Sequence, residues 1–485
     1  MDALKKLKAG AGYPAARLAA AFLLLTGVSA SGCGRENGAP GDREAVVRTD
    51  PARRTEANPV RAKIERYLAA AVENWNFQGS VLVARGSGVI LGKGLGFADL
   101  EKEIPNTPDT KFQIASVTKV FTAAAVMKLA EEGKIRIDEP ASRYLPEYED
   151  ILGTGITIGH LLSHSSGLPE FTPGAAGRAD MTQALEPREF IEAIRSRRPF
   201  FAPGLGVRYS NVGYVLLGLV IEKVTGRSYD GWLEGHVLKP LGMSDTGTDP
   251  DYPSRPGFAR GYIDDRSGAL RPAPFIHPAW AYSAGALYST VEDLHKFDRA
   301  LSSPGFLTAA SLETMFRPRN RTFSFGWLVG DAFGRRFEAH GGGGPGFSAW
   351  VERWPDDDAF VAVLSNVTGA PAGEVGRSLA AAVFGEAFVL PAKRIPVSVP
   401  PAELEQFAGD YRMKDGEIRR VVLDGDALFV VRGDGPRHPI LPYARDSFFF
   451  VTDKSAFIRF TRDARGRVTG QVFHQLGVDE PAQKM

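Results

Sequence analysis

Cysteine is almost absent from this sequence of 485 residues, because Cys33 is the only one. A single thiol can form neither an intrachain disulfide nor a thiolate metal cluster, so the fold must rest on its hydrophobic core. An excess of charge of one sign is also lacking, since the formal net charge is +1 and no basic stripe interleaved with aromatic residues occurs. The electrostatic signature of a nucleic-acid binder is therefore missing, and no nucleic-acid partner is expected.

Other chemistries lack their motifs as well. Histidine and carboxylate residues nowhere show the spacing of a metal site, and no phosphate-cradling glycine motif is present. We therefore expect neither a metal nor a cofactor. What the sequence does have is the composition of a globular protein, with 44% hydrophobic and 24% charged residues. Its length leaves room for two folded units.

The N-terminal residues indicate export. Three lysines precede an apolar stretch over residues 18–28, which is too short to span a bilayer but suits a signal peptide. The run that follows ends in Gly32-Cys33 and resembles a bacterial lipobox, although Ala30 stands where leucine is usual. We expect residues 1–33 to be a lipoprotein-type signal peptide and Cys33 to carry a lipid anchor in the bacterial cell envelope. Ordinary signal cleavage near Gly32 is the alternative.

Changes in composition divide the rest of the chain. Residues 34–59 are rich in glycine, proline and charged residues and poor in apolar ones, which predicts a flexible tether. A proline-rich linker at 391–401 separates a domain at 60–390 from a C-terminal domain at 402–485. The C-terminal residues show short alternating strands at regular spacing, with an Asp-Gly hairpin signal at 424–425. This pattern favours a small accessory β-barrel.

Both helical and strand patterns occur in the larger domain. Apolar residues recur at helical spacing before residue 75, and an alanine-rich apolar helix is expected from Val120 to Glu132, ended by Gly133. The middle of the domain is expected to consist mostly of helices and loops. Strands are expected near both ends of the domain, at 80–84, 89–91, 336–339, 347–353 and 360–364. The sheet is thus expected to assemble from segments far apart in the sequence, as in an α+β fold.

Ser116 and Lys119 stand at the start of the alanine-rich helix. A serine hydroxyl is a poor nucleophile at neutral pH unless a neighbouring base or cation activates it. If Ser116 begins this helix, Lys119 lies three residues on and on the same face, within reach of the hydroxyl. Lys119 also stands in an apolar run over 117–126, where burying a lysine costs desolvation energy. The pair is therefore a candidate catalytic pair, with an N-capping serine and a snorkelling lysine as the alternative.

Two runs of residues resemble those of a known family. The run Phe-Gln-Ile-Ala-Ser-Val-Thr-Lys that ends at Lys119 resembles the nucleophile motif of serine β-lactamases and penicillin-binding proteins. Tyr209-Ser210-Asn211 is similar to the Tyr-x-Asn element of class C β-lactamases, D-alanyl-D-alanine carboxypeptidases and related esterases. The resemblance implies that Tyr209 is a general base or proton relay whose phenol is acidified by Lys119. It also implies that Asn211 holds the substrate amide or orients Lys119.

The third element is a histidine followed by a glycine run, His340 to Gly346, where the family's β-lactamases usually have Lys-Thr-Gly. It looks like the His-x-Gly version found in esterases, D-amino-acid peptidases and amidases of the family. The resemblance implies that His340 lies on the strand edging the cleft and that Gly342 and Gly343 let substrate lie close to the backbone. It places the oxyanion hole at the N–H groups of Gly343 and Ser116.

The resemblance extends over roughly residues 59–388 and implies a β-lactamase-like antiparallel sheet flanked by helices, with an all-helical region; the C-terminal barrel is expected to be lipocalin-like. It implies a serine hydrolase that acts through an acyl-enzyme on an ester, amide or D-amino-acid peptide. Because a histidine is largely neutral at pH 7, His340 favours esterase or D-amino-acid peptidase activity over efficient β-lactamase activity. A binding protein of the same fold, recognising peptidoglycan fragments or a protein partner, is the alternative, and the oligomeric state stays open.

Overall fold

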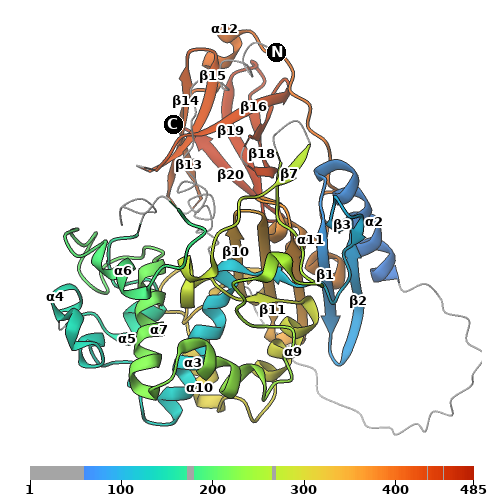
Figure 1. Ribbon diagram of the computed structural model, residues 1–485. Helices are drawn as coiled ribbons and strands as arrows, with labels where there is room; N and C mark the ends of the chain where they lie inside the picture. The colour runs from blue at the N-terminus through green and yellow to red at the C-terminus, as the bar shows by residue number, and fades with distance from the viewer. Residues whose placement is uncertain are drawn as a thin grey trace, which may run out of the picture.

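The computed structural model describes residues 59–153, 155–171, 180–264, 269–414, 416–433, 435–451 and 453–485. The expected signal peptide with Cys33, and the tether up to residue 58, lie outside the described residues. The described residues form a domain of sheet and helices and a C-terminal β-barrel, at the bottom and top of Figure 1. No described helix is both long and apolar enough to cross a membrane.

The larger domain is built on a six-stranded antiparallel sheet with the order β2-β1-β12-β11-β10-β9. Its strands are β1 (Gly79–Arg85), β2 (Gly88–Leu95), β9 (Leu328–Ala332), β10 (Arg335–Gly344), β11 (Phe347–Trp354) and β12 (Ala359–Ser365). Strand β1 pairs along its whole length with β12, almost three hundred residues later in the chain. The expected assembly of the sheet from both ends of the domain, and the α+β class, are confirmed.

Side-chain alternation along the central strands divides the core in two. Val361 and Val363 of β12 pack with α2 (Pro59–Trp75) and α11 (Ala372–Phe384) on one face of the sheet. Ala362 and Leu364, between and after them, point to the other face and pack with the helices there. Because helices cover both faces, β12 is buried throughout and apolar up to its last residue, Ser365, rather than alternately polar.

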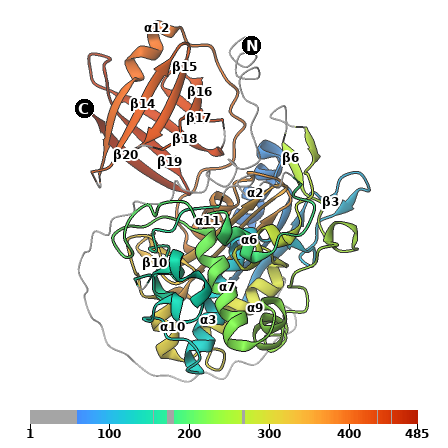
Figure 2. The ribbon, with the colours of Figure 1, turned by 60° about the vertical axis from the view of Figure 1, so that its left-hand side comes forward.

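The second face of the sheet is covered by the helices and loops of the middle of the domain. They are α3 (Thr118–Glu131), α4 (Glu149–Leu152), α5 (Ile158–Leu162), α6 (Pro187–Glu192), α7 (Asn211–Thr225), α8 (Tyr229–Leu233), α9 (Val291–Ser302) and α10 (Ala309–Phe316). Helix α3 is buried along most of its length, and Figures 1 and 2 both show it beside α7. The expected helix Val120–Glu132 is therefore present, and it starts two residues earlier, at Thr118.

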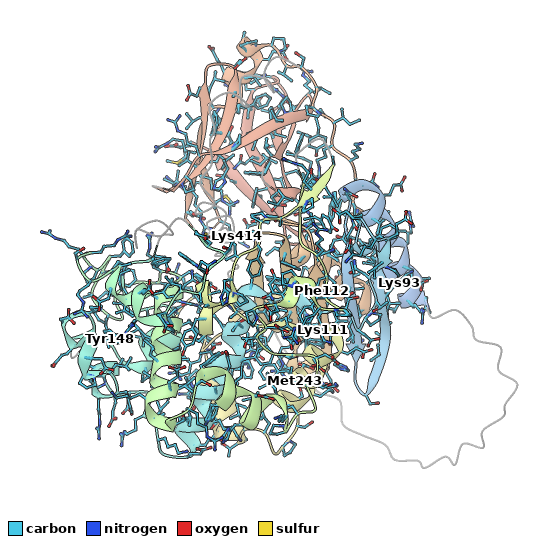
Figure 3. The ribbon with its side chains drawn as sticks, in the orientation of Figure 1. Lys93, Lys111, Phe112, Tyr148, Met243 and Lys414 are labelled. Carbon is cyan, nitrogen blue, oxygen red and sulfur yellow. The ribbon has the colours of Figure 1, made fainter. Side chains whose placement is uncertain are left out.

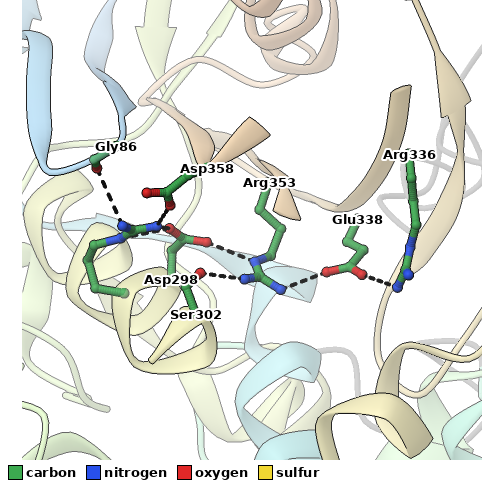
Figure 4. Close-up of polar contacts among 8 residues, drawn as sticks. Gly86, Asp298, Ser302, Arg336, Glu338, Arg353 and Asp358 are labelled. Atoms are coloured by element: carbon green, nitrogen blue, oxygen red, sulfur yellow. Dashed lines mark hydrogen bonds and ion pairs between the residues drawn. The ribbon is translucent and has the colours of Figure 1, made fainter. Parts of the chain in front are cut away.

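A buried ion-pair network ties α9 to the sheet (Figure 4). Arg353 of β11 donates from Nε to Asp298 Oδ1 at 2.8 Å and from Nη1 to Glu338 Oε2 at 2.7 Å. Its third nitrogen, Nη2, donates to Ser302 Oγ at 2.7 Å. Glu338 on β10 also pairs with Arg336. Since Asp298 and Ser302 belong to α9, one guanidinium links this helix to two neighbouring strands.

The C-terminal domain is a closed eight-stranded antiparallel barrel, as expected. Its strands are β13 (Gly409–Met413), β14 (Ile418–Asp424), β15 (Ala427–Arg432), β16 (His438–Ala444), β17 (Ser447–Phe450), β18 (Asp453–Arg462), β19 (Val468–Gln475) and β20 (Val478–Lys484). Leu404 of α12 (Pro401–Leu404) and Phe407 just after it join the barrel's apolar core, where Phe407 contacts the rings of Phe448 and Phe460. The short helix thus packs onto the barrel core (Figure 2).

The barrel contacts the larger domain through the turn between β19 and β20. Gly477 in this turn donates its N–H to Glu374 Oε2 of α11 at 2.9 Å. His474 at the end of β19 lies between the carboxylates of Asp479, at 2.7 Å, and Glu374, at 3.6 Å. Lys414, in the turn after β13, lies in Figure 3 at the end of the barrel nearest the larger domain. Lys454 of β18 also contacts the larger domain, donating to the Trp75 carbonyl at 3.3 Å. Polar side chains therefore form part of the contact between the two domains.

Candidate active site

Ser116 lies on a tight turn at the start of α3. The turn is a single 3₁₀ turn, Ala115–Val117, that runs directly into the α-helix at Thr118. Ala115 has a φ of +45°, a left-handed conformation that is costly for alanine and often found at functional sites. Figure 3 labels Phe112 on the short strand that leads into this turn. Ser116 is partly exposed, whereas the three residues after it are buried.

Lys119 is completely buried, and its Nζ lies within hydrogen-bond distance of three oxygens. These are Ser116 Oγ at 3.1 Å, Asn211 Oδ1 at 2.9 Å and the carbonyl oxygen of Ala284 at 2.6 Å. Burial lowers the pKa of Lys119 to about 7, against the opposing effect of the Glu170 carboxylate. The snorkelling alternative is therefore wrong, and the lysine lies next to the serine as expected.

Tyr209 lies beside this pair, but its phenol is not acidified. Lys119 Nζ is 4.8 Å from the centre of the Tyr209 ring, and the hydroxyl is buried without a hydrogen-bond partner at normal distance among the described residues. Burial raises the pKa of Tyr209 although the nearby Ser116 side chain lowers it. The expectation of a low phenol pKa is therefore wrong, because the loss of hydration outweighs the effect of Ser116 and the Glu170 charge raises the pKa further.

Asn211 is held at both its side chain and its backbone. It begins α7 after the N-cap Ser210, whose Oγ accepts from the N–H of Gly213. The Asn211 amide oxygen accepts from Lys119, and its backbone N–H donates to Glu170 Oε2 at 2.8 Å. Of the two expected roles for Asn211, orientation of Lys119 is the one that these contacts favour.

His340 lies on β10 at the margin of the site. Strand β9 pairs with β10 only up to Ala339, so His340 and the glycines after it lie beyond the reach of the edge strand. The His340 ring donates from Nδ1 to the carbonyl of Gly341 at 2.7 Å, which leaves Nε2 as a buried acceptor without a partner among the described residues. Burial and the charge of Lys119 lower the pKa of His340 to about 3. The ring is thus neutral at pH 7.

The two glycines predicted to contact substrate differ in their surroundings. A Cβ at Gly342 would lie 2.0 Å from the carbonyl oxygen of Ile114, in the segment that leads to Ser116. A glycine is therefore needed here to let that segment approach β10. Gly343 is exposed. Contact of either residue with substrate stays a prediction, as does the lipid on Cys33.

Three groups that hold the site together were not among the predicted site residues. Glu170 and His164 lie in the loop after α5, and Ala284 supplies a backbone carbonyl to Lys119. A backbone acceptor leaves no signal in the sequence, and the two loop residues are more than thirty positions from Tyr209. Within the described residues, no cluster of three or more histidine, cysteine and carboxylate side chains could hold a metal ion.

Comparison with known proteins finds matches for both domains. The beta-lactamase family model matches residues 61–384, and the model of a domain of unknown function, DUF3471, matches residues 393–484. Penicillin-binding protein 4* of Bacillus subtilis (strain 168) is 27% identical over 416 residues, which cover 80% of this chain and 91% of that protein.

Two solved structures extend the comparison. The octameric penicillin-binding protein homologue from Pyrococcus abyssi superposes with a TM-score of 0.63 at 25% identity, covering 87% of this chain and 99% of that one. The D-amino acid amidase from Ochrobactrum anthropi SV3 in complex with D-phenylalanine has a TM-score of 0.58 at 25% identity, covering 67% and 99%. Because the first family model spans well over half of the chain, this protein belongs to the beta-lactamase family.

Proposed function

We propose that this protein is a serine hydrolase that works through an acyl-enzyme on Ser116. The observation that carries the proposal is the contact between Ser116 Oγ and a buried Lys119 whose pKa is about 7. At neutral pH a large fraction of the lysine is an uncharged amine, which can accept the serine proton. A lysine at its usual pKa could not act as a base there.

The proposed reaction has two halves. Oγ of Ser116 attacks the substrate carbonyl carbon while Lys119 Nζ takes the hydroxyl proton, and the oxyanion accepts hydrogen bonds from the N–H groups of Ser116 and Gly343. The C–O or C–N bond then breaks, and the proton passes to the leaving group by way of the Tyr209 hydroxyl. In the second half, water attacks the acyl carbon and gives a proton to Tyr209 and Lys119. The bond between the acyl carbon and Ser116 Oγ then breaks, the acid leaves, and the proton passes to Oγ, which restores Ser116.

The charge of the site favours a particular class of substrate. His340 is neutral, so it offers no permanent cation to a substrate carboxylate where β-lactamases of the family have lysine. Arg208, the cation next to Tyr209 in the sequence, stacks on the Phe200 ring at 3.6 Å. We therefore propose esters, amides or D-amino-acid peptides as substrates in preference to β-lactams. The amidase bound to D-phenylalanine is a relative that supports amide substrates.

The location of the reaction is a separate proposal. Lipidation of Cys33 would hold the enzyme in the bacterial cell envelope, because a lipid chain on the cysteine partitions into the membrane.

Hydrolysis of p-nitrophenyl butyrate tests the proposed function. Wild type should release p-nitrophenol, Ser116→Ala should show no activity above background, and Lys119→Ala and Tyr209→Phe should be slowed. Equal rates for all four proteins would contradict the proposal and favour a binding protein of this fold. A second panel of nitrocefin, short-chain esters and D-amino-acid amides should show nitrocefin as the poorest substrate.

A further inference from the structure

The loop after α5 is hydrogen-bonded to the backbone of the Tyr209–Asn211 element and of the residue before it. Three backbone N–H groups donate to it: Arg208 to the His164 carbonyl at 2.9 Å, Ser210 to His164 Nδ1 at 3.1 Å, and Asn211 to Glu170 Oε2 at 2.8 Å. Hydrogen bonds at three positions within four residues fix the backbone of this element. The loop therefore controls the direction in which the Tyr209 and Asn211 side chains leave the chain.

His164 also packs against the side chain of Tyr209. Its ring stacks on that of Tyr209, with centres 4.4 Å apart and planes 29° from parallel. Burial, then the neighbouring Lys119 and His340 side chains, lower the pKa of His164 well below its usual value. Because Nδ1 accepts the Ser210 N–H, the ring proton lies on Nε2. His164 is a neutral platform that does not titrate near pH 7.

Glu170 is the carboxylate whose charge acts on Lys119. One carboxylate oxygen accepts from Asn211 N, as above, and the other accepts from Phe171 N at 3.2 Å. Asn211 in turn holds Lys119 Nζ through its amide oxygen at 2.9 Å. The Glu170 carboxylate is thus connected to the Lys119 ammonium through Asn211, by one hydrogen bond to its backbone N–H and one to its amide oxygen.

The other titratable groups that face Lys119 carry no negative charge at neutral pH. They are Tyr209 just before α7, Tyr214 in α7, His164 in the loop after α5, and His340 on β10. A positive charge on a fully buried lysine is costly unless an anion lies nearby. Burial raises the pKa of Glu170, whereas the Asn211 N–H and the Lys119 charge lower it, so a protonated Lys119 favours the carboxylate form. When Lys119 takes the Ser116 proton, the anion that offsets the new charge is Glu170.

We propose that Glu170 is a positioning residue that acts on Lys119 through Asn211, orienting its amine toward Ser116 and stabilising its protonated form during acylation. The inference rests on the proposed function, since it assigns a role in the same proton transfer. Glu170 itself does not contact the reacting atoms of the substrate.

The pH dependence of Ser116 acylation by a fluorophosphonate separates this role from a structural one. Because the Glu170 charge favours protonated Lys119, Glu170→Gln should move the acidic limb of the rate to lower pH by about one unit and lower the plateau rate about tenfold. Glu170→Asp keeps the charge and should leave the midpoint of the limb close to wild type. Glu147→Gln, an exposed carboxylate of the same helical region, is the matched control and should match wild type.

Two outcomes would overturn the inference. If the Gln and Asp variants both lose rate while their limbs stay at the wild-type midpoint, Glu170 has only a structural role. Glu170 also has only a structural role if thermal unfolding shows that Glu170→Gln is unfolded and Glu170→Asp acylates more slowly than wild type.

A titration without substrate keeps the inference separate from the proposed function. The ε-methylene resonance of Lys119 in 13C-lysine-labelled full-length protein, assigned by its loss in Lys119→Ala, reports the lysine pKa directly. A lower pKa in Glu170→Gln supports the inference, and an unchanged pKa overturns it. Absence of acylation in wild type would contradict the proposed function, whatever this titration shows.

Discussion

Lys119 is the residue on which the proposed chemistry depends most. It is completely buried, and burial rather than any single neighbour brings its pKa to about 7. Its ammonium donors have three oxygen acceptors, which compensate in part for the lost hydration. The neutral amine has only two N–H donors, which can bind the Asn211 and Ala284 oxygens. Its lone pair can then accept the hydrogen of the Ser116 hydroxyl.

The rate of ester hydrolysis should therefore rise with pH through about 7 and level off above it. Below that pH Lys119 is protonated and cannot take the Ser116 proton. The fall in rate on the acidic side of the profile, the acidic limb, therefore reports the protonation of Lys119. A profile of kcat/KM between pH 5 and pH 9 measures this limb. Lys119→Ala should lower kcat/KM by about 10²- to 10⁴-fold and abolish the limb. A limb that persists in the variant would belong to another group.

Gly342 tests whether the turn that carries Ser116 must lie against β10. In Gly342→Ala the new Cβ would meet the Ile114 carbonyl, so the segment before Ser116 must move. A shift of about 1 Å at a nucleophile costs on the order of 100-fold in kcat. Gly344→Ala on the same strand is the control, because nothing lies within 4 Å of its added Cβ. Equal activity of the two variants would contradict this account of Gly342.

Local rules predict the Ser116–Lys119 contact but not the rest of the site. Three residues along a helix place two side chains on one face whatever surrounds them. The pKa of Tyr209 depends on how deeply the hydroxyl is buried, which the resemblance did not convey. Glu170 reaches Asn211 only because the loop after α5 folds over the start of α7. Such contacts arise from packing, and no spacing in the sequence encodes them.

At the scale of elements, α9 depends on the buried guanidinium of Arg353. The partners Asp298 and Glu338 are 3% and 1% exposed at their side chains, and the guanidinium side chain is 4% exposed. Without Arg353, these buried carboxylates keep only the more exposed Arg299 and Arg336 as counter-charges, which is more costly than losing a surface pair.

Arg353→Met should accordingly lower the free energy of unfolding by about 3–5 kcal/mol. Urea titration followed by circular dichroism measures the change. Arg317→Met is the control, because its pair with Glu313 is exposed and should contribute less than about 1 kcal/mol. A loss below about 1 kcal/mol in Arg353→Met would mean that α9 is held by its apolar face alone.

Helix and strand patterns predicted the elements themselves well. The sequence predicts the alanine-rich helix because Gly133 follows a nearly continuous apolar run. Its observed start at Thr118 directly follows the 3₁₀ turn at Ala115–Val117. The pairing of β1 with β12 was expected only in outline. Register depends on which apolar faces meet across the sheet, and those faces come from opposite ends of the domain.

At the scale of the whole molecule, His474 links the barrel to the larger domain. Burial alone would lower its pKa, but hydrogen bonds and charges from Glu374 and Asp479 raise the pKa above its usual value. A raised folded-state pKa means that the stabilisation is present below about pH 6.5 and is lost as pH rises through the folded value.

His474→Gln should therefore lower Tm more at pH 5.5 than at pH 9, with a loss of about 1–2 kcal/mol at the lower pH. His438→Gln in the same barrel should show the opposite pH trend, because burial lowers the pKa of His438. Thermal unfolding of the three proteins at both pH values provides the measurement. A Tm loss in His474→Gln that does not change with pH would show that its charge plays no part in the domain contact.

The central claim, that Ser116 is acylated with Lys119 as the proton acceptor, is tested most directly by intact-mass spectrometry of the full chain after incubation with a fluorophosphonate. The account predicts one adduct per chain, mapped to the peptide that carries Ser116, absent in Ser116→Ala and formed much more slowly in Lys119→Ala. No adduct in the wild-type protein, or an adduct that persists in Ser116→Ala, would contradict it.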